Sequence, residues 1–286
     1  MILFPNAKIN LGLDILSRRP DGYHEVATVM YPLPWCDVLE IVPSSGSDAT
    51  LTVSGRSVGC PVEKNLVMKA YRALQEAVPG LPAADIYLRK IVPDGAGLGG
   101  GSSDAAFTLR GLNDLFALGL DDAFLASVAS SLGADCPFFI YNRPMLCTGI
   151  GTELEPVDVP CVAGMTVGVV KPAVSVPTRD AYAGVCPQIP EVALADVIAD
   201  FPYGDSARRV CNAFEHSVLE AYPAIACVKD TFLNDARLPR PVYVSMSGSG
   251  SAVYALYSPG SCSADKLSAA MQEVFPDCDV FSSVMA

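Results

Sequence analysis

The chain of 286 residues carries 31 acidic and 19 basic side chains, so its formal net charge at pH 7 is −12. A surface of that sign repels nucleic-acid phosphates and anionic lipid headgroups, which argues against nucleic-acid and membrane partners. Hydrophobic residues make up 51% and charged residues 17% of the chain, a composition that favours a full-size buried core and excludes a disordered chain.

No apolar run reaches the roughly 18 residues of a membrane span, and the amino-terminal residues lack a signal-like stretch, so we expect a cytoplasmic protein. Ten cysteines are scattered without a C-x-x-C pair, and we expect most of them to be small core residues. The only histidines are His24 and His216, which argues against chemistry that needs several imidazoles. We interpret His216 as a packing residue in a helix.

The first part of the chain alternates β-branched segments with turns. We predict strands here at 8–15, 25–33, 38–42 and 49–53. A helix is predicted over 65–78, where Leu66, Ala70 and Ala77 recur at helical spacing before Pro79 and Gly80 end the pattern.

A short strand at 85–92 leads into a glycine tract, and a second helical pattern follows with Ala105, Leu109 and Leu112 on its buried face. The remaining predicted elements are a helix at 121–132, strands at 145–148 and 165–170, helical stretches within 207–234, a strand at 241–245, a strand at 252–257, a helix at 264–275 and a final strand. This mixed order of strands and helices indicates an α+β fold rather than a regular βαβ winding.

The glycine tract is the most informative segment of the sequence. Five glycines fall between positions 95 and 101 in PDGAGLGGGSSDAA, directly before the second predicted helix. Unobstructed backbone N–H groups at a helix N-terminus bind anions, and Ser102 or Ser103 can cap the helix or reach a phosphate or a magnesium ion. The tract therefore predicts a phosphate-binding loop, with a flexible turn before a capped helix as the alternative.

Common phosphate-binding motifs do not explain this tract. The spacing Gly95-x-Gly97-x-x-Gly100 formally satisfies the dinucleotide fingerprint, but a helix follows where that motif needs a second strand with an acidic residue. The P-loop pattern fails because Gly101 stands where its lysine belongs. The protein-kinase motifs H-R-D and D-F-G and the hydrolase motif G-x-S-x-G do not occur. A phosphate loop of another architecture remains.

The segment PDGAGLGGGSSDAA resembles the second motif of the GHMP kinases, a family named for galactokinase, homoserine kinase, mevalonate kinase and phosphomevalonate kinase. The amino-terminal PNAKINLGLDI resembles their first motif, and MSGSGSAVYALY resembles their third. This resemblance implies an α+β GHMP kinase fold with two lobes around a cleft. The ATP-binding lobe, like ribosomal protein S5 domain 2, would span 1–150, and a carboxy-terminal lobe would span 151–286.

Within the family, the segments AKINLGLDILSRRPDGYHEVATVMYPL and GADCPFFIY are most similar to one branch. The resemblance implies phosphorylation by ATP of the 2-hydroxyl of a cytidine-diphosphate-linked methylerythritol, in the non-mevalonate route to isoprenoid precursors. The partner would be this small molecule, with magnesium accompanying ATP, and the sequence identifies no metal ligand.

The resemblance places Lys8 and Asp135 at the family's catalytic positions. Asp135 would accept the hydroxyl proton, and Lys8 would orient it and offset charge on the transferring phosphoryl group. A strand-surface lysine and a helix-terminus aspartate are the alternative interpretations. We interpret Cys136, beside the proposed base, as a wall residue because no histidine or second cysteine lies near it in sequence.

The resemblance also assigns the ATP-binding positions. These are Asn65, near adenine, and along the loop Pro93, Asp94, Gly95, Ala96, Gly97, Leu98, Gly99, Gly100, Gly101, Ser102 and Ser103. The turn formed by Gly248, Ser249 and Gly250 would lie beside the phosphates.

The substrate-binding positions lie outside the glycine tract. Tyr23, His24 and Tyr182 fall where this branch binds cytosine, since two aromatic faces can sandwich a pyrimidine and a histidine can read its edge. Asn10 and Thr178 would contact the methylerythritol and phosphate part. Half-buried packing of the tyrosines and a surface histidine are the alternatives.

Two other functions stay open at this point. One is another small-molecule kinase of the family, of homoserine or mevalonate type, which would lack a cytidine requirement. The other is a catalytically silent binding protein, because a fold does not imply an activity. A substrate panel separates the first from a cytidine-dependent kinase, and ATP turnover separates the second.

Overall fold

The computed structural model describes residues 1–286, which form two compact units. Unit 1 comprises Met1–Lys8, Trp35–Asp94 and Gly99–Arg143, and unit 2 comprises Ile9–Pro34, Gly95–Leu98 and Pro144–Ala286. The chain therefore passes between the units several times, and the glycine tract changes unit after Leu98.

Unit 1 is built on a four-stranded sheet of order β1-β4-β6-β5. Its strands are β1 (Ile2–Leu3), β4 (Val38–Pro43), β5 (Thr50–Gly55) and β6 (Ala84–Lys90). β4 runs antiparallel to β1 and β6, whereas β5 runs parallel to β6. Alternate residues of β6, among them Ile86, Leu88 and Lys90, are buried, so one face of the sheet forms part of the core.

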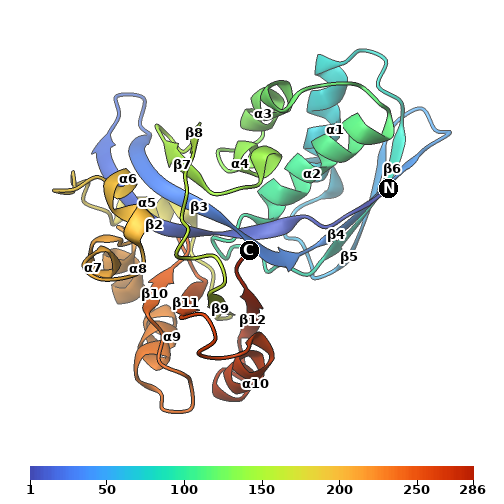
Figure 1. Ribbon diagram of the computed structural model, residues 1–286. Coiled ribbons are helices and arrows are strands. Elements are labelled where there is room, and N and C mark those ends of the chain that lie inside the picture. The colour runs from blue at the N-terminus through green and yellow to red at the C-terminus, as the bar shows by residue number, and fades with distance from the viewer. The chain divides into compact units, whose positions relative to one another are not determined.

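Helices complete the core of unit 1. They are α1 (Leu66–Ala77), α2 (Gly100–Leu115), α3 (Asp122–Ser130) and α4 (Cys136–Tyr141), while the short η1 (Val62–Lys64) before α1 has no buried residue. α2 is central, because it packs against α1, α4 and β4 (Figure 1). Two N-terminal caps agree with their residue types: Asn65 accepts a hydrogen bond from Val67 N, and Asp121 accepts one from Phe124 N.

Unit 2 contains two further four-stranded sheets, β2-β3-β7-β8 and β10-β11-β9-β12. The first is formed by β2 (Asn6–Arg18), β3 (His24–Cys36), β7 (Met145–Thr148) and β8 (Glu153–Pro156), of which β2 and β3 extend into unit 1. The second is formed by β9 (Thr166–Lys171), β10 (Tyr243–Met246), β11 (Val253–Tyr257) and β12 (Asp279–Val284). The second sheet is antiparallel throughout, with Val169 opposite both Tyr254 and Phe281.

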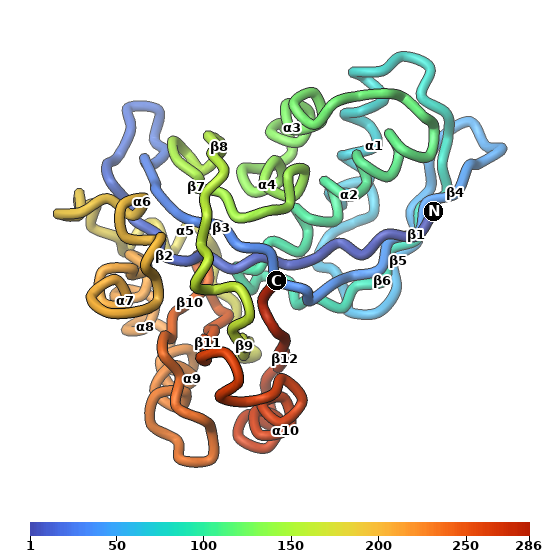
Figure 2. The backbone as a smooth tube through the Cα atoms, viewed as in Figure 1, coloured from blue at the N-terminus to red at the C-terminus, as the bar shows by residue number.

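Two helices cover the second sheet of unit 2. α9 (Pro223–Asn234) packs on β10 and β11, and α10 (Ala264–Val274) packs on β9 and β12 (Figure 1). Between β9 and α9 the chain forms short helices, namely α5 (Thr178–Ala183), α6 (Leu194–Val197), η2 (Ile198–Asp200), α7 (Ser206–Arg209) and α8 (Glu215–Ala221) (Figure 2). The hydrophobic core runs from Leu13 of β2 through Phe214 to Phe232 and Met271.

The predicted α+β class is confirmed, and the predicted long strands and helices are present within a few residues. The prediction missed β1, β8, α4, α5 and α6. α4 shows why: its residues Cys136–Ile140 are buried all round, so no apolar period of 3.6 marks the helix. None of the helices is both long and apolar enough to cross a bilayer.

Two smaller expectations are wrong. All ten cysteines are free thiols, but only Cys136 and Cys147 are buried, while four are half-buried and four exposed. A small residue with little charge can occupy either environment, so composition does not decide its burial. His216 lies in α8 and is exposed rather than packed.

Candidate active site

Lys8 and Asp135 form an ion pair in unit 1. Lys8 Nζ lies 3.4 Å from Asp135 Oδ2, and the exposed fractions of the two side chains are 4% and 33%. Asp135 occupies the N-cap position of α4 without making a side-chain cap bond, so its carboxylate is not used in holding the helix. The Lys8 ammonium is buried, whereas the Asp135 carboxylate is accessible to solvent. Such a pair can accept a proton from a substrate and stabilise the negative charge that develops beside it.

The end of the glycine tract forms the N-terminus of α2. Gly99 is the N-cap residue, so Ser102 and Ser103 do not cap the helix, which was one of the two roles that the sequence left open for them. The first backbone hydrogen bond of α2 is donated by Ser103 N to Gly99 O, at 2.9 Å. The N–H groups of Gly100, Gly101 and Ser102 precede it and have no partner inside the helix. Together with the helix dipole, they can bind an anion.

Two glycines of the tract make room for protein atoms. Gly97 has a φ of 71°, and a Cβ there would lie 2.0 Å from the backbone oxygen of Ser247. Gly99 has a φ of 70°, and its Cβ would lie 2.9 Å from Phe139 Cζ and 3.1 Å from Lys8 Cγ. The sequence suggested only that phosphate oxygens need this space. The structure shows that the close approach of other motifs of the chain needs it as well.

Three predicted segments meet in unit 2, namely Asn10, the residues Gly95–Leu98 and the turn Ser247–Gly250. Ser247 Oγ donates a hydrogen bond to Gly97 O at 2.9 Å, and Ala252 N, just after the turn, donates one to Ala96 O at 3.1 Å. A Cβ on Gly248 would lie 3.3 Å from Asn10 Oδ1. The turn therefore lies directly against the glycine tract and against Asn10.

Replacing Gly97 with alanine should destabilise the protein by more than about 1 kcal/mol, because alanine is strained at this φ and its Cβ meets a backbone oxygen. The matched control is Gly101→Ala, a helical position where the nearest atom to an added Cβ is Leu66 Cδ1 at 3.5 Å. Thermal unfolding of both variants makes the comparison. Equal melting temperatures would contradict the close approach of tract and turn.

A buried charge network that the sequence did not suggest lies beside the first turns of α2 in unit 1. Lys90 Nζ donates hydrogen bonds to Asp37 Oδ2 and, at 2.7 Å, to Asp104 Oδ2. Asp37 Oδ1 also accepts from the backbone N–H groups of Ile91 and Val92. The network thus joins β6, at the entrance of the tract, to α2 at its exit. The only sequence signal was the presence of charged residues within apolar segments.

The two carboxylates of this network are not equivalent. Asp37 accepts three hydrogen bonds, whereas Asp104 Oδ1 is buried without a partner. Burial raises the pKa of Asp104 to about 7, although the charge of Lys90 opposes the shift. Burial thus favours the protonated form of the Asp104 carboxyl group.

The shifted pKa of Asp104 predicts a pH dependence of stability. Native Asp104 keeps its proton up to about pH 7, whereas an unfolded chain releases it near the ordinary value of 3.8. The stability from this group is therefore full at acid pH and declines as the pH rises between these two values. Asp104→Asn, which is neutral at every pH, should show a flatter decline in melting temperature between about pH 5 and 7. Identical slopes would refute this assignment.

Two of the three predicted cytosine-binding residues, His24 and Tyr182, contact each other in unit 2. The rings of His24 and Tyr182 stack with centroids 4.9 Å apart, and Tyr182 meets Phe214 edge-on at 4.8 Å. Thr178 and Tyr182 lie four residues apart in α5, so they share one face of that helix. Tyr23 is 62% exposed. With their ring centroids 4.9 Å apart, His24 and Tyr182 leave no room for a base between them in this arrangement.

The remaining predicted residues have these surroundings. Asn65 is buried and uses its side-chain oxygen to cap α1. Ser103 Oγ is buried without a hydrogen-bond partner at the start of α2. Burial raises the pKa of the Cys136 thiol to about 11, which agrees with a wall residue rather than a nucleophile. No group of three histidine, cysteine or acidic side chains could hold a metal ion.

Comparisons with known proteins agree with the motifs. The sequence model of the GHMP kinases N terminal domain matches residues 65–143. The chain is 47% identical to a 4-diphosphocytidyl-2-C-methyl-D-erythritol kinase of Parabacteroides distasonis, over 90% of this chain and 92% of that protein. It is 46% identical to the enzyme of that name from Bacteroides fragilis, over 91% and 93% of the two chains.

Solved structures extend the comparison to the fold. A crystal structure of a 4-(cytidine 5'-diphospho)-2C-methyl-D-erythritol kinase superposes with a TM-score of 0.78 at 32% identity, covering 99% of this chain and 98% of the other. A homoserine kinase from Cytophaga hutchinsonii superposes with a TM-score of 0.63 at 20% identity, covering 98% and 94%. The second likeness concerns the fold alone. The GHMP kinase fold predicted from the three motifs is confirmed.

Proposed function

This chain belongs to the 4-diphosphocytidyl-2-C-methyl-D-erythritol kinases, a group of GHMP kinases, and from that premise we propose its reaction. The proposed enzyme transfers the γ-phosphoryl group of ATP to the 2-hydroxyl of 4-diphosphocytidyl-2-C-methyl-D-erythritol. The products are the 2-phosphate and ADP, in the non-mevalonate route to isoprenoid precursors. The observation that carries the proposal is the Lys8–Asp135 pair beside the N-terminus of α2 in unit 1.

Each group of the pair has a role in the proposed transfer. The oxygen of the substrate 2-hydroxyl bonds to the γ-phosphorus, and the bond between that phosphorus and the ADP oxygen breaks. Asp135 accepts the proton that the 2-hydroxyl loses. Lys8, 3.4 Å from the carboxylate, orients Asp135 and offsets negative charge on the phosphoryl oxygens. The N–H groups of Gly100, Gly101 and Ser102 supply hydrogen bonds to phosphate.

GHMP kinases use ATP as the phosphoryl donor, and we include magnesium in the proposal. Mg²⁺ in such sites is held largely by substrate phosphates and water, with one or two oxygen ligands from the protein. The unpartnered Ser103 Oγ at the start of α2 fits that need. The ion would neutralise phosphate charge. Asn65, which caps α1, is the residue proposed to lie near adenine.

The proposed function is tested by incubating the protein with ATP and diphosphocytidyl-methylerythritol and following the products by phosphorus NMR. A new phosphomonoester resonance and ADP are expected. Homoserine and mevalonate serve as control acceptors and should not be phosphorylated. Turnover of either control without the cytidine substrate would identify another GHMP kinase. ATP binding without turnover of any acceptor would indicate a silent binding protein.

Replacing Tyr23 with alanine should weaken binding of the cytidine substrate by roughly tenfold to a hundredfold, because loss of one base stack costs about 1 to 3 kcal/mol. ATP affinity should stay nearly unchanged. Tyr87→Ala, which removes another exposed tyrosine, is the matched control. Calorimetric titration with each ligand separately measures both affinities. Weaker ATP binding with an unaffected cytidine substrate would place Tyr23 at the adenine instead.

A further inference from the structure

The side chains of Asn212 and Glu215 hold the backbone of the glycine turn in unit 2. Asn212 Nδ2 donates hydrogen bonds to Met246 O and Gly248 O, each at 2.8 Å. Glu215 Oε1 accepts one from Met246 N at 2.7 Å and one from Ser245 Oγ at 3.2 Å. The two side chains therefore bind backbone groups on both sides of Ser247, where β10 ends and the turn begins.

Both holding side chains are themselves fixed by other parts of unit 2. Asn212 is 5% exposed, and its Oδ1 accepts a hydrogen bond from Phe214 N at 3.0 Å. Backbone hydrogen bonds of 2.8 Å from Leu13 N to Cys211 O and from Ala213 N to Leu13 O tie this segment to β2. The Nδ2 group of Asn212 therefore donates twice and its Oδ1 accepts once. These three hydrogen bonds fix the orientation of the side-chain amide.

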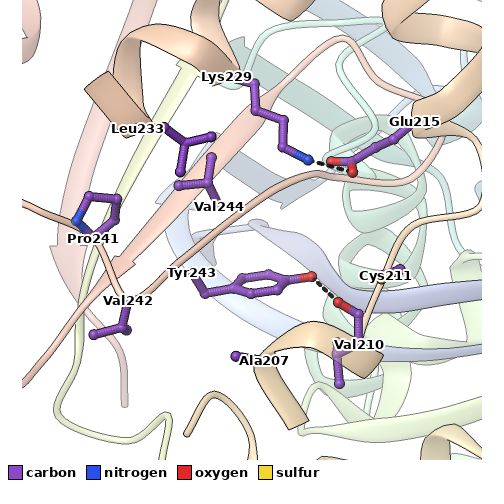
Figure 3. A pocket seen from close by; sticks show the side chains of 10 residues that line it. All are labelled: Ala207, Val210, Cys211, Glu215, Lys229, Leu233, Pro241, Val242, Tyr243 and Val244. Atoms are coloured by element: carbon purple, nitrogen blue, oxygen red, sulfur yellow. Dashed lines mark hydrogen bonds and ion pairs between the residues drawn. The ribbon is translucent and has the colours of Figure 1, made fainter. Parts of the chain in front are cut away.

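The two carboxylate oxygens of Glu215 have different partners: one binds the glycine turn, and the other pairs with Lys229 at a pocket. The pocket, of about 250 Å³, is lined in part by Lys229, Glu215 and Tyr243. Figure 3 shows Lys229 and Glu215 facing each other along one side of it, with Lys229 Nζ 2.6 Å from Glu215 Oε2. The other oxygen, Oε1, bonds to Met246 N. The ion pair thus fixes the carboxylate in the orientation in which it holds the turn.

The turn Ser247–Gly250 also supports the glycine tract. Gly97 passes so close to Ser247 O that no Cβ fits, and Ser247 Oγ donates to Gly97 O. A closely packed contact transmits a shift of a few tenths of an ångström, because neither backbone can yield without losing hydrogen bonds. Displacement of Met246 or Gly248 would therefore move Gly97.

We propose that Asn212 and Glu215 are positioning residues for phosphoryl transfer, which hold the turn Ser247–Gly250 and through it the residues Gly95–Leu98. The inference rests on the proposed function and on the resemblance that assigns Gly95, Ala96, Gly97 and Leu98 as ATP-binding positions. Neither side chain is assigned a contact with substrate. Lys229 acts one step further away, by orienting Glu215.

The test separates the hydrogen bond to the turn from the ion pair. Glu215→Gln keeps an oxygen that can accept from Met246 N, whereas Glu215→Leu does not. We expect Glu215→Leu and Asn212→Leu to lower kcat by roughly tenfold to a hundredfold, the range expected when reacting groups are misplaced by about 1 Å. Glu215→Gln should keep most of the turnover, and Lys229→Met, which leaves the oxygen that binds Met246 N in place but no longer oriented, should lower kcat less than Glu215→Leu. Asp235→Asn, which weakens the partly exposed ion pair with Arg237, is the control and should match the wild type.

Hydrogen–deuterium exchange supplies a readout that does not depend on turnover. Amides of residues 246–252 should exchange faster in Glu215→Leu and Asn212→Leu, while those of α10 stay unchanged. Equal kcat values for Glu215→Gln and Glu215→Leu, or unchanged exchange in the turn, would overturn the inference. Global acceleration of exchange would also overturn it, since it would show a role in stability alone.

Failure of the proposed function gives a different pattern. A wild-type protein without turnover of the cytidine substrate would refute the proposed reaction, while the exchange data on the variants would still decide whether the turn is held. Protection of 246–252 by a non-hydrolysable ATP analogue in the wild type, reduced in Glu215→Leu, is the result expected of phosphate positioning. Absence of that protection would overturn the link to phosphate.

Discussion

Asp135→Asn should lower kcat by roughly a hundredfold or more while leaving the fold and ATP affinity largely intact. Asparagine has nearly the same shape as aspartate, but its amide cannot take the proton of the acceptor hydroxyl. The side chain of Asp135 does not cap α4, so the substitution removes no helix-stabilising bond. Steady-state kinetics with both substrates measures kcat, calorimetric titration measures the affinity for ATP, and thermal unfolding measures the stability of the fold.

The matched control for Asp135 is Asp122→Asn, which removes an exposed acidic group in the first turn of α3 in the same unit. It changes the net charge equally and should keep wild-type turnover. Near wild-type kcat for Asp135→Asn would show that another group accepts the proton. A large fall in melting temperature would instead assign Asp135 a structural role.

Lys8→Met should lower kcat on the order of a hundredfold or more, because it removes the cation held beside the proposed base. Methionine keeps much of the apolar stem that lies beside Gly99, so packing suffers less than in an alanine variant. Turnover should fall more than ATP binding, since the charge matters most as the phosphoryl group transfers. Equal losses in the two would contradict this role.

Two further variants sharpen the test of Lys8. Lys69→Met removes an exposed lysine from α1 of the same unit and should leave turnover unchanged. The double variant Lys8→Met with Asp135→Asn should be little slower than the slower single variant, because groups that act as a unit lose their effect together. Fully additive losses would indicate that the two side chains act independently.

The parts of the fold that sequence could predict are those whose signal is local. The helix over 65–78 shows its apolar spacing within four turns, and its observed start follows the Asn65 cap. The glycine tract before α2 is similar, because glycines and a helix start are neighbours in the chain. Short helices such as the buried α4 and the largely exposed α5 escaped prediction, since six residues are too few to show a period.

The site divides in the same way. Residue types at Lys8, Asp135 and the three motifs could be identified, because each motif is a contiguous string that resembles its family. The positions of these residues relative to one another could not be predicted from the sequence. Nothing in the string GADCPFF shows that its carboxylate lies 3.4 Å from a lysine near the amino terminus. Similarly, the motifs did not reveal that Gly97 is a glycine because Ser247 occupies the space of its Cβ.

Contacts between segments far apart in the chain were decided by the tertiary structure alone. The network of Asp37, Lys90 and Asp104 and the hold of Asn212 and Glu215 on the glycine turn are of this kind. Each of these side chains is polar and occurs in a segment whose local pattern allows an exposed or a buried position. A buried polar group is stable only where distant donors and acceptors meet it, and packing of the whole chain determines that meeting.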